Sequence, residues 1–293
     1  MSGRVVALEV NPQDPTKFYV AYASGGVWYT DNNGTSFNSI SDDWPTQNIG
    51  EIAMDWNNGI LWVGTGENNS SRSSYSGIGI LKTNADGSNW ENVGLHDSHH
   101  IGKILINPEN SNHVVIGVTG HLYSNNINRG VYVTKDGGKN WNRTLYVNDV
   151  SGIIDMSETP GDFNVMYATS WEKDRKAWNF DEDGHSSGIY KSIDGGANWS
   201  LMSNDESGFP TGAGVGRIGI AVFDKDIVYA VVDNQNFRET TEKKLDQGLT
   251  KESFIGMSLE NFNKLSVSDL KAFLRSNRFP SKYKAEALSL IHI

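Results

Sequence analysis

Four copies of one octet restrict the fold of this chain more than any other feature. The two best-matched copies are Thr134–Trp141 (TKDGGKNW) and Ser192–Trp199 (SIDGGANW), and the more distant copies are Thr30–Phe37 (TDNNGTSF) and Thr83–Trp90 (TNADGSNW). All four have Ser or Thr first, Gly fifth and Trp or Phe eighth. Each copy directly follows a short β-like run that begins with glycine, so the octet marks one recurring turn.

The segments before each octet predict short antiparallel strands. Two strand candidates precede every glycine-headed run, and the pairs are 3–10 with 18–22, 49–55 with 60–64, 101–107 with 114–118, and 153–157 with 165–169. A fifth pair is 217–223 with 227–232. Four short strands that recur at intervals of roughly fifty residues are typical of propeller blades. We therefore predict an all-β fold, a β-propeller with about four and a half four-stranded antiparallel blades.

Within each blade the octet is predicted to form the turn between the third and fourth strands. Glycine supplies the positive φ of a tight hairpin, and Asn or Asp side chains bind the backbone of the turn. The terminal aromatic ring is expected to be buried between neighbouring sheets. The predicted structural positions are Asn32, Gly34, Phe37, Gly87, Trp90, Asp136, Gly138, Trp141, Asp194, Gly196 and Trp199.

These octets resemble Asp-boxes, which are also called bacterial neuraminidase (BNR) repeats. The phrases ASGGVWYT, WVGTGENN, HIGKILINPEN and GHLYSNNINRGVYVTKDGGKNW resemble large bacterial exported propellers with sortilin-type repeats, which are often labelled glycosyl hydrolases. The resemblance covers about residues 1–238. It implies a longer parent protein, of which this chain is a truncated fragment, located outside the cell, at the cell surface or in the periplasm.

Composition excludes several classes of protein. The net charge is −10 and no basic run is present, which argues against nucleic acid as a partner. No run of eighteen apolar residues exists, so no membrane-spanning helix is predicted. The chain has no cysteine, which excludes disulfides and thiolate metal sites.

Three segments are expected along the chain. Residues 1–237 carry the propeller blades, and residues 238–287 form a helical insertion in the fifth blade with Thr250, Ser258 and Ser266 as N-caps. Residues 288–293 (LSLIHI) match the translation of a sequencing-library adapter and are interpreted as an artefact.

Candidate binding residues gather on the loops between second and third strands and on the blade-to-blade connections at the same end, which include residues 94–100. In an antiparallel blade these loops, 65–76, 119–129 and 170–187, all lie at one end, and long varied loops on a rigid scaffold often bind ligands. We predict that this face holds a glycan or a peptide, with no cofactor and no metal. The predicted ligand-binding residues are Asn68, Arg72, His99, His100, His121, Arg129, Trp171, Arg175 and Trp178.

Several of these residues have structural alternatives. Glu67 could pair with Arg72 and organise its own loop, and one of His99 and His100 is expected to point inward. The histidine spacing matches no zinc signature. The rings of Trp171 and Trp178 could instead pack their loop against its blade.

Three functions remain open at this stage: a binding module, a glycoside hydrolase acting on a polysaccharide, or a scaffold within a larger surface protein. Glycosidases use two carboxylates, and Glu67 and Glu172 are the predicted catalytic pair at this face. Xyloglucan-cleaving propellers with similar repeats carry a catalytic aspartate before the Gly-Gly of the first blade. The matching stretch here, Ala23-Ser24-Gly25-Gly26, has no carboxylate.

Overall fold

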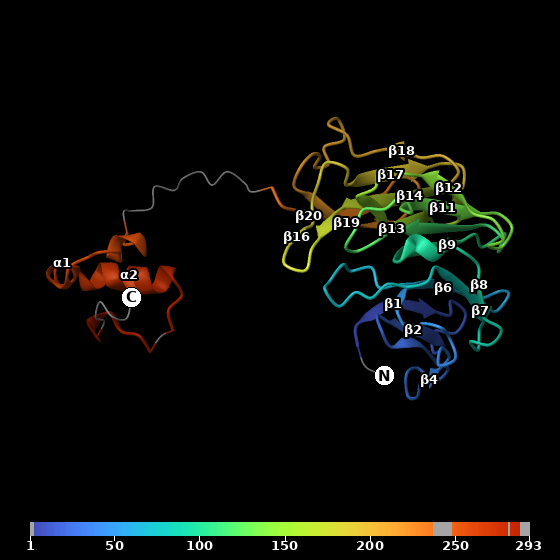
Figure 1. Ribbon diagram of the computed structural model, residues 1–293, viewed down its shortest axis with the longest axis horizontal. Coiled ribbons are helices and arrows are strands. Elements are labelled where there is room, and N and C mark those ends of the chain that lie inside the picture. The colour runs from blue at the N-terminus through green and yellow to red at the C-terminus, as the bar shows by residue number, and fades with distance from the viewer. Residues whose placement is uncertain (1–2, 237–247, 281, 288–293) are drawn as a thin grey trace. The chain divides into compact units, whose positions relative to one another are not determined.

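The computed structural model describes residues 3–236, 248–280 and 282–287, and the chain divides into two compact units, Met1–Asn236 and Phe237–Ile293 (Figure 1). The proposed adapter segment at residues 288–293 and the predicted start of the helical region lie outside the described residues.

The first unit is a β-propeller of four complete antiparallel blades and the beginning of a fifth, as predicted. The first blade consists of β1 (Val5–Val10), β2 (Phe18–Tyr22), β3 (Gly26–Thr30) and β4 (Asn38–Ser39), and the second of β5 (Ile49–Asp55), β6 (Ile60–Thr65), β7 (Ile80–Asn84) and β8 (Glu91–Asn92). The third blade consists of β9 (Ile101–Ile106), β10 (Val114–Val118), β11 (Gly130–Thr134) and β12 (Asn142–Leu145).

The fourth blade consists of β13 (Ser151–Thr159), β14 (Asp162–Glu172), β17 (Gly188–Ser192) and β18 (Ser200–Leu201). Its loop between β14 and β17 contains a small hairpin of β15 (Asp174–Arg175) and β16 (Phe180–Asp181). The fifth blade begins with the pair β19 (Val215–Val222) and β20 (Val228–Asn234). A short 3-10 helix, His96–Ser98, lies between β8 and β9.

The hydrophobic cores lie between successive blades. Leu61 of the second blade packs in one buried cluster with Tyr19 of the first, and Val114 of the third packs in another with Trp62 of the second. The first strands of consecutive blades contact one another, so β1, β5, β9, β13 and β19 follow in spatial order. Burial of both faces of a blade explains why β5 and β10 are buried along their whole length.

The octets form the predicted turns between third and fourth strands. In the third blade, Asp136 Oδ1 accepts hydrogen bonds from Thr134 Oγ1 at 2.8 Å and from the Asn140 backbone N–H at 2.9 Å. Asp194 makes the corresponding contacts with Ser192 at 2.8 Å and Asn198 at 2.9 Å. The side chain of the following asparagine also donates to each carboxylate, and these hydrogen bonds lower the pKa of both aspartates to about 2.

The expected burial of Trp90 is wrong. Its side chain is 39% exposed, whereas the Trp141 ring packs in the core between the second and third blades and donates to the Val93 carbonyl at 2.7 Å. The second octet has Ala85 at the third position, and Asp86 instead accepts from the Ser88 backbone N–H at 2.9 Å. This turn closes through the Ser88 carbonyl instead, which accepts from Thr83 Oγ1 at 2.8 Å and from the Asn84 backbone N–H at 3.1 Å.

The second unit contains short helices around an aromatic core. Helices α1 (Leu259–Asn263) and α2 (Val267–Ser276) lie between the 3-10 turns Glu252–Phe254 and Ala285–Ala287. The predicted N-caps Ser258 and Ser266 are confirmed, because each hydroxyl accepts from the backbone three residues later. Thr250 is not an N-cap, since Lys251 takes that position. Within the described residues no helix is long and apolar enough to cross a bilayer.

Candidate ligand-binding site

Loops from the second and third blades enclose a pocket at the predicted face. This mouth pocket has a volume of about 360 Å³. It is lined by Ser74, Tyr75, Ser76, His99, His100, His121, Leu122, Tyr123 and Ser124. Three of the nine predicted ligand-binding residues, His99, His100 and His121, therefore lie together in one wall.

Two stacked imidazoles form one side of the mouth pocket. The rings of His99 and His121 lie parallel with their centroids 3.6 Å apart. His121 is held at both nitrogens, by Ser124 Oγ at 3.0 Å and by the Asp97 carbonyl at 3.1 Å. Burial and the neighbouring His121 lower the pKa of His99, so this ring is neutral at pH 7 and offers hydrogen bonds rather than charge.

His100 is the member of the histidine pair that points inward, as expected. It is 3% exposed, and burial lowers its pKa to about 3. Its Nδ1 is buried and has no hydrogen-bond partner among the described residues. A buried polar atom without a partner costs free energy, which makes it a candidate for contact with a ligand.

Close backbone packing fixes the wall that carries the histidines. The Gly77 N–H donates to the His99 carbonyl at 2.7 Å. Gly66 has a φ of +86°, and a Cβ at this position would lie 1.8 Å from the same carbonyl oxygen. Only glycine fits here, because both the left-handed backbone and the contact exclude a side chain. The second-blade loop is therefore locked against the start of the third blade.

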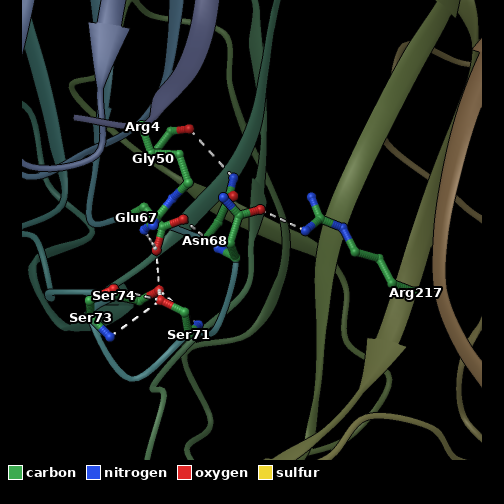
Figure 2. Close-up of polar contacts among 9 residues, drawn as sticks. Arg4, Gly50, Glu67, Asn68, Ser71, Ser73, Ser74 and Arg217 are labelled. Atoms are coloured by element: carbon green, nitrogen blue, oxygen red, sulfur yellow. Dashed lines mark hydrogen bonds and ion pairs between the residues drawn. The ribbon is translucent and has the colours of Figure 1, made fainter. Parts of the chain in front are cut away.

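Glu67 holds the same loop from behind the mouth pocket (Figure 2). Its carboxylate pairs with Arg4 at 3.2 Å, accepts from the Asn69 backbone N–H at 3.1 Å and contacts the Ser74 hydroxyl. Arg72 is exposed, so the hypothesis of a Glu67–Arg72 pair is wrong and Arg4 from the first blade takes that place. Glu67 is 1% exposed and is used to organise the loop.

Contacts across blades continue at the next two positions of this loop. Asn68 Nδ2 donates to the carbonyls of Ile101 and Gly102 at 3.1 Å each. Arg217 reaches from β19 of the fifth blade and donates to Asn69 Oδ1 at 2.8 Å (Figure 2). One loop thus binds the first, third and fifth blades together.

Arg129 and Lys173 are two buried cations near this wall. Arg129 is 1% exposed and donates to the carbonyls of Thr119 at 2.6 Å, His121 at 2.9 Å and Ser124 at 3.2 Å. Lys173 is 4% exposed, and its Nζ lies 5.8 Å from the centre of the Trp171 ring. Burial, together with the positive charge of Arg129, lowers the pKa of Lys173 to about 7.

The remaining predicted residues of the fourth-blade loop lie outside the pocket wall. The buried Trp171 indole donates to the Glu182 carbonyl at 2.8 Å, and Glu172 Oε2 accepts from the Ser186 backbone at 2.9 Å and hydroxyl at 2.6 Å. Trp178 is 86% exposed between β15 and β16, and Arg175 packs 4.5 Å from the Phe180 ring. Trp171 thus packs its own loop, Trp178 does not, and ligand contact by these residues stays a prediction.

Sequence reasoning missed four residues of this region, which are Tyr75, Tyr123, Lys173 and Arg217. The two tyrosines are detectable in principle, since each is an aromatic residue within a predicted mouth loop. Lys173 and Arg217 become notable only through burial and contacts between blades. Over residues 3–236, 248–280 and 282–287, no group of three or more His, Asp or Glu side chains is arranged to hold a metal.

The fold and these loops define a propeller module with a ligand-sized pocket at one end. Among solved structures, the chain is similar to an ancestral GH74 enzyme, with 20% identity and a TM-score of 0.54 over 74% of this chain and 27% of that one. It is also similar to a GH74 enzyme of Niastella koreensis, with 18% identity and a TM-score of 0.50 over 73% of this chain and 31% of that one.

At these identities the likeness shows the propeller fold alone. The chain spans about a third or less of the length of these two enzymes. No protein-family model and no curated protein matches the chain. The assignment of the octets to Asp-box or sortilin-type repeats therefore stays a prediction.

Proposed function

We propose that the mouth pocket binds a saccharide. The observation that carries this proposal is the pair of exposed aromatic faces at its rim, Tyr75 at 58% and Tyr123 at 49% exposure. Exposed tyrosine rings supply apolar faces for stacking while their hydroxyls remain hydrated. A sugar ring has the matching combination of an apolar face and hydroxyl groups around its edge.

The polar groups between the tyrosines suit the same ligand. Imidazoles of His99 and His121 and the hydroxyls of Ser74, Ser76 and Ser124 line the pocket. His121, Ser74 and Ser124 are already hydrogen-bonded within the chain, whereas the His99 imidazole and the Ser76 hydroxyl can donate and accept hydrogen bonds, as sugar hydroxyls require. A peptide that binds by strand addition needs an exposed sheet edge, whereas this pocket is built from loops. A saccharide is therefore favoured over a peptide.

We propose further that the chain is part of a larger exported propeller protein and that its octets are Asp-boxes. The outward faces of the first and last strands support additional blades. On β1, Leu8 is 56% exposed, and on β20, Tyr229 and Val231 are 64% and 77% exposed. Between blades the corresponding surfaces are buried, as on β5 and β10. Neighbouring blades of the same propeller would cover these apolar faces.

Binding rather than hydrolysis is the favoured activity. Glu67 and Glu172 both hold loop backbone, and neither lines the mouth pocket. A glycan array followed by calorimetry tests the proposal. We expect the Tyr75→Ala/Tyr123→Ala double variant to bind at least about fivefold more weakly, because each lost aromatic contact is worth about 0.5–1.5 kcal/mol.

Tyr229→Ala is the matched control, because it removes an equally exposed tyrosine from β20, outside the pocket. This control should bind like the wild type. The proposal would be overturned if no saccharide bound, or if the double variant kept full affinity. Release of reducing sugar that is lost in Glu67→Gln would instead establish the hydrolase.

A further inference from the structure

Buried cations that form no ion pair with the described residues lie behind the wall of the mouth pocket. The basic cluster consists of Arg129 and Lys173, both at least nine-tenths buried, together with the partly buried Arg175. Lys173 is close enough to His100, in the pocket wall, for its charge to act on that ring. The region is unusual in a chain whose net charge is −10.

Asp149, Asp174 and Glu182 act electrostatically on the basic cluster, but none of them forms an ion pair with it. Asp174 pairs with Lys176 at 2.9 Å, and Glu67 pairs with Arg4 at 3.2 Å. Glu172 accepts from Ser186. Within the described parts of the chain, the only aromatic or charged partner in direct contact with Lys173 Nζ is the Trp171 ring. The guanidinium of Arg217 lies 5.7 Å from the centre of the same ring. Among the described residues, no acidic side chain therefore forms an ion pair with this cluster.

Unpaired polar atoms mark the same place. Arg129 Nε, Arg175 Nε and His100 Nδ1 are buried and have no hydrogen-bond partner among the described residues. Burying a cation without a partner costs several kcal/mol, so such groups normally face an acid, a metal or a ligand. The unpaired His100 Nδ1 in the pocket wall and the unpaired atoms of the basic cluster behind it indicate a missing acceptor.

We infer that the mouth pocket takes a saccharide that carries a carboxylate, with the acid group held beside His100 by the positive charge of Lys173. The inference rests on the proposed function, because the aromatic rim binds the sugar and the basic cluster selects the acid. A carboxylate has acceptor sites for both an ammonium and a second donor. It would supply the ion-pair partner that the described residues lack.

Matched oligosaccharides test the choice of ligand. Trigalacturonate has three carboxylates, and its methyl ester has the same size and shape without charge. We expect the free acid to bind at least tenfold more tightly than the ester. Equal affinity for both would overturn this inference but leave saccharide binding intact. If neither these nor any other arrayed glycan binds, the proposed function itself fails, so the two failures are distinguishable.

A substitution then assigns the preference to Lys173. Lys173→Met keeps the length of the side chain and removes its charge. We expect it to weaken binding of the free acid at least tenfold and to leave the ester unchanged. Lys225→Met removes the same charge from an exposed lysine in the turn between β19 and β20 and controls for net charge. Equal losses in both variants would contradict a specific role.

The pH dependence of the wild type gives a second test that needs no variant. Around Lys173 lie Arg129, Arg175, His100 and Asp174, and its pKa of about 7 means that it loses its proton above neutral pH. Binding of the free acid should therefore fall on the order of a hundredfold from pH 6 to pH 9, while binding of the ester stays level. A flat profile for the acid would overturn the inference.

Peptides provide the competing source of a carboxylate. A tripeptide with a free C-terminus and its C-terminal amide can be titrated under the same conditions. We expect neither to displace bound trigalacturonate at a hundredfold excess. Displacement by the free peptide alone would show that the acid site belongs to a peptide ligand and would overturn the saccharide.

Discussion

At the scale of single residues, identical side chains serve different purposes because their turns differ. Trp90 and Trp141 both end an octet, but only the turn of Trp141 has an aspartate at its third position. Asp136 binds the backbone of Asn140, directly before Trp141, and the indole then reaches the Val93 carbonyl of the neighbouring blade. The two turns thus close through different contacts, and only Trp141 packs its ring between two blades.

This difference predicts unequal costs of truncation. Trp141→Ala should lower the free energy of unfolding by about 3 kcal/mol, because it leaves a cavity between two blades. Trp90→Ala should change it by about 0.5 kcal/mol or less, since the ring is 39% exposed. Urea titration of both variants measures the costs, and Trp178→Ala should resemble Trp90→Ala. Equal losses for Trp90 and Trp141 would contradict the assigned packing.

Replacing the buried Lys173 with methionine should stabilise the protein by an amount that depends on pH. The folded pKa of Lys173, about 7, lies below the ordinary lysine pKa of 10.5. Between these two values the native state therefore binds fewer protons than the unfolded state. The penalty for the buried charge is therefore full below pH 7 and declines as pH rises. Lys173→Met should stabilise the protein by about 2 kcal/mol more at pH 6 than at pH 9, measured by urea unfolding. A gain independent of pH would show that Lys173 keeps its ordinary pKa and stays charged in the native state over this range.

At the scale of elements, the sequence predicted the strands well and the contacts of the site poorly. Strands were recognisable because each glycine-headed run and each octet is a local pattern with a local physical cause. The contact between Arg217 and Asn69 joins residues 148 positions apart. Such a pair depends on how many blades curve around the centre and on how far a loop projects, and neither is encoded by nearby residues.

The loop after β6 illustrates an element whose shape is set by backbone contact. Gly66 and Gly59 both have positive φ, but only a Cβ at Gly66 would meet another atom, the His99 carbonyl oxygen. Gly59→Ala should cost about 1–2 kcal/mol from backbone strain alone. Gly66→Ala should cost more and should also abolish saccharide binding, because the histidine wall must move. Calorimetric binding and thermal unfolding of both variants distinguish a local strain from a displaced loop.

At the scale of the whole molecule, the first strands bring charged side chains from successive blades together. Glu9 on β1, Glu51 on β5, Lys103 on β9 and Glu158 on β13 interact electrostatically, and Lys103 lies 3.2 Å from Glu51. None of these residues was singled out from sequence, since each is an ordinary polar residue within its own strand. Their proximity is a property of the propeller arrangement rather than of any single blade.

The raised pKa of Glu9 gives a test of this arrangement of the first strands. Burial and the negative charge of Glu51 raise the pKa of Glu9 from the ordinary glutamate value of 4.5 to about 7, although Lys103 opposes the shift. Between these values the native state binds more protons than the unfolded state, so stability should fall as pH rises. The fall due to Glu9 should amount to at most about 3 kcal/mol, and Glu9→Gln should remove it. Urea unfolding of the wild type and of Glu9→Gln at pH 4.5 and pH 7.5 measures how the stability of each depends on pH. An unchanged slope in Glu9→Gln would mean that Glu9 is solvated and that the first strands do not converge as described.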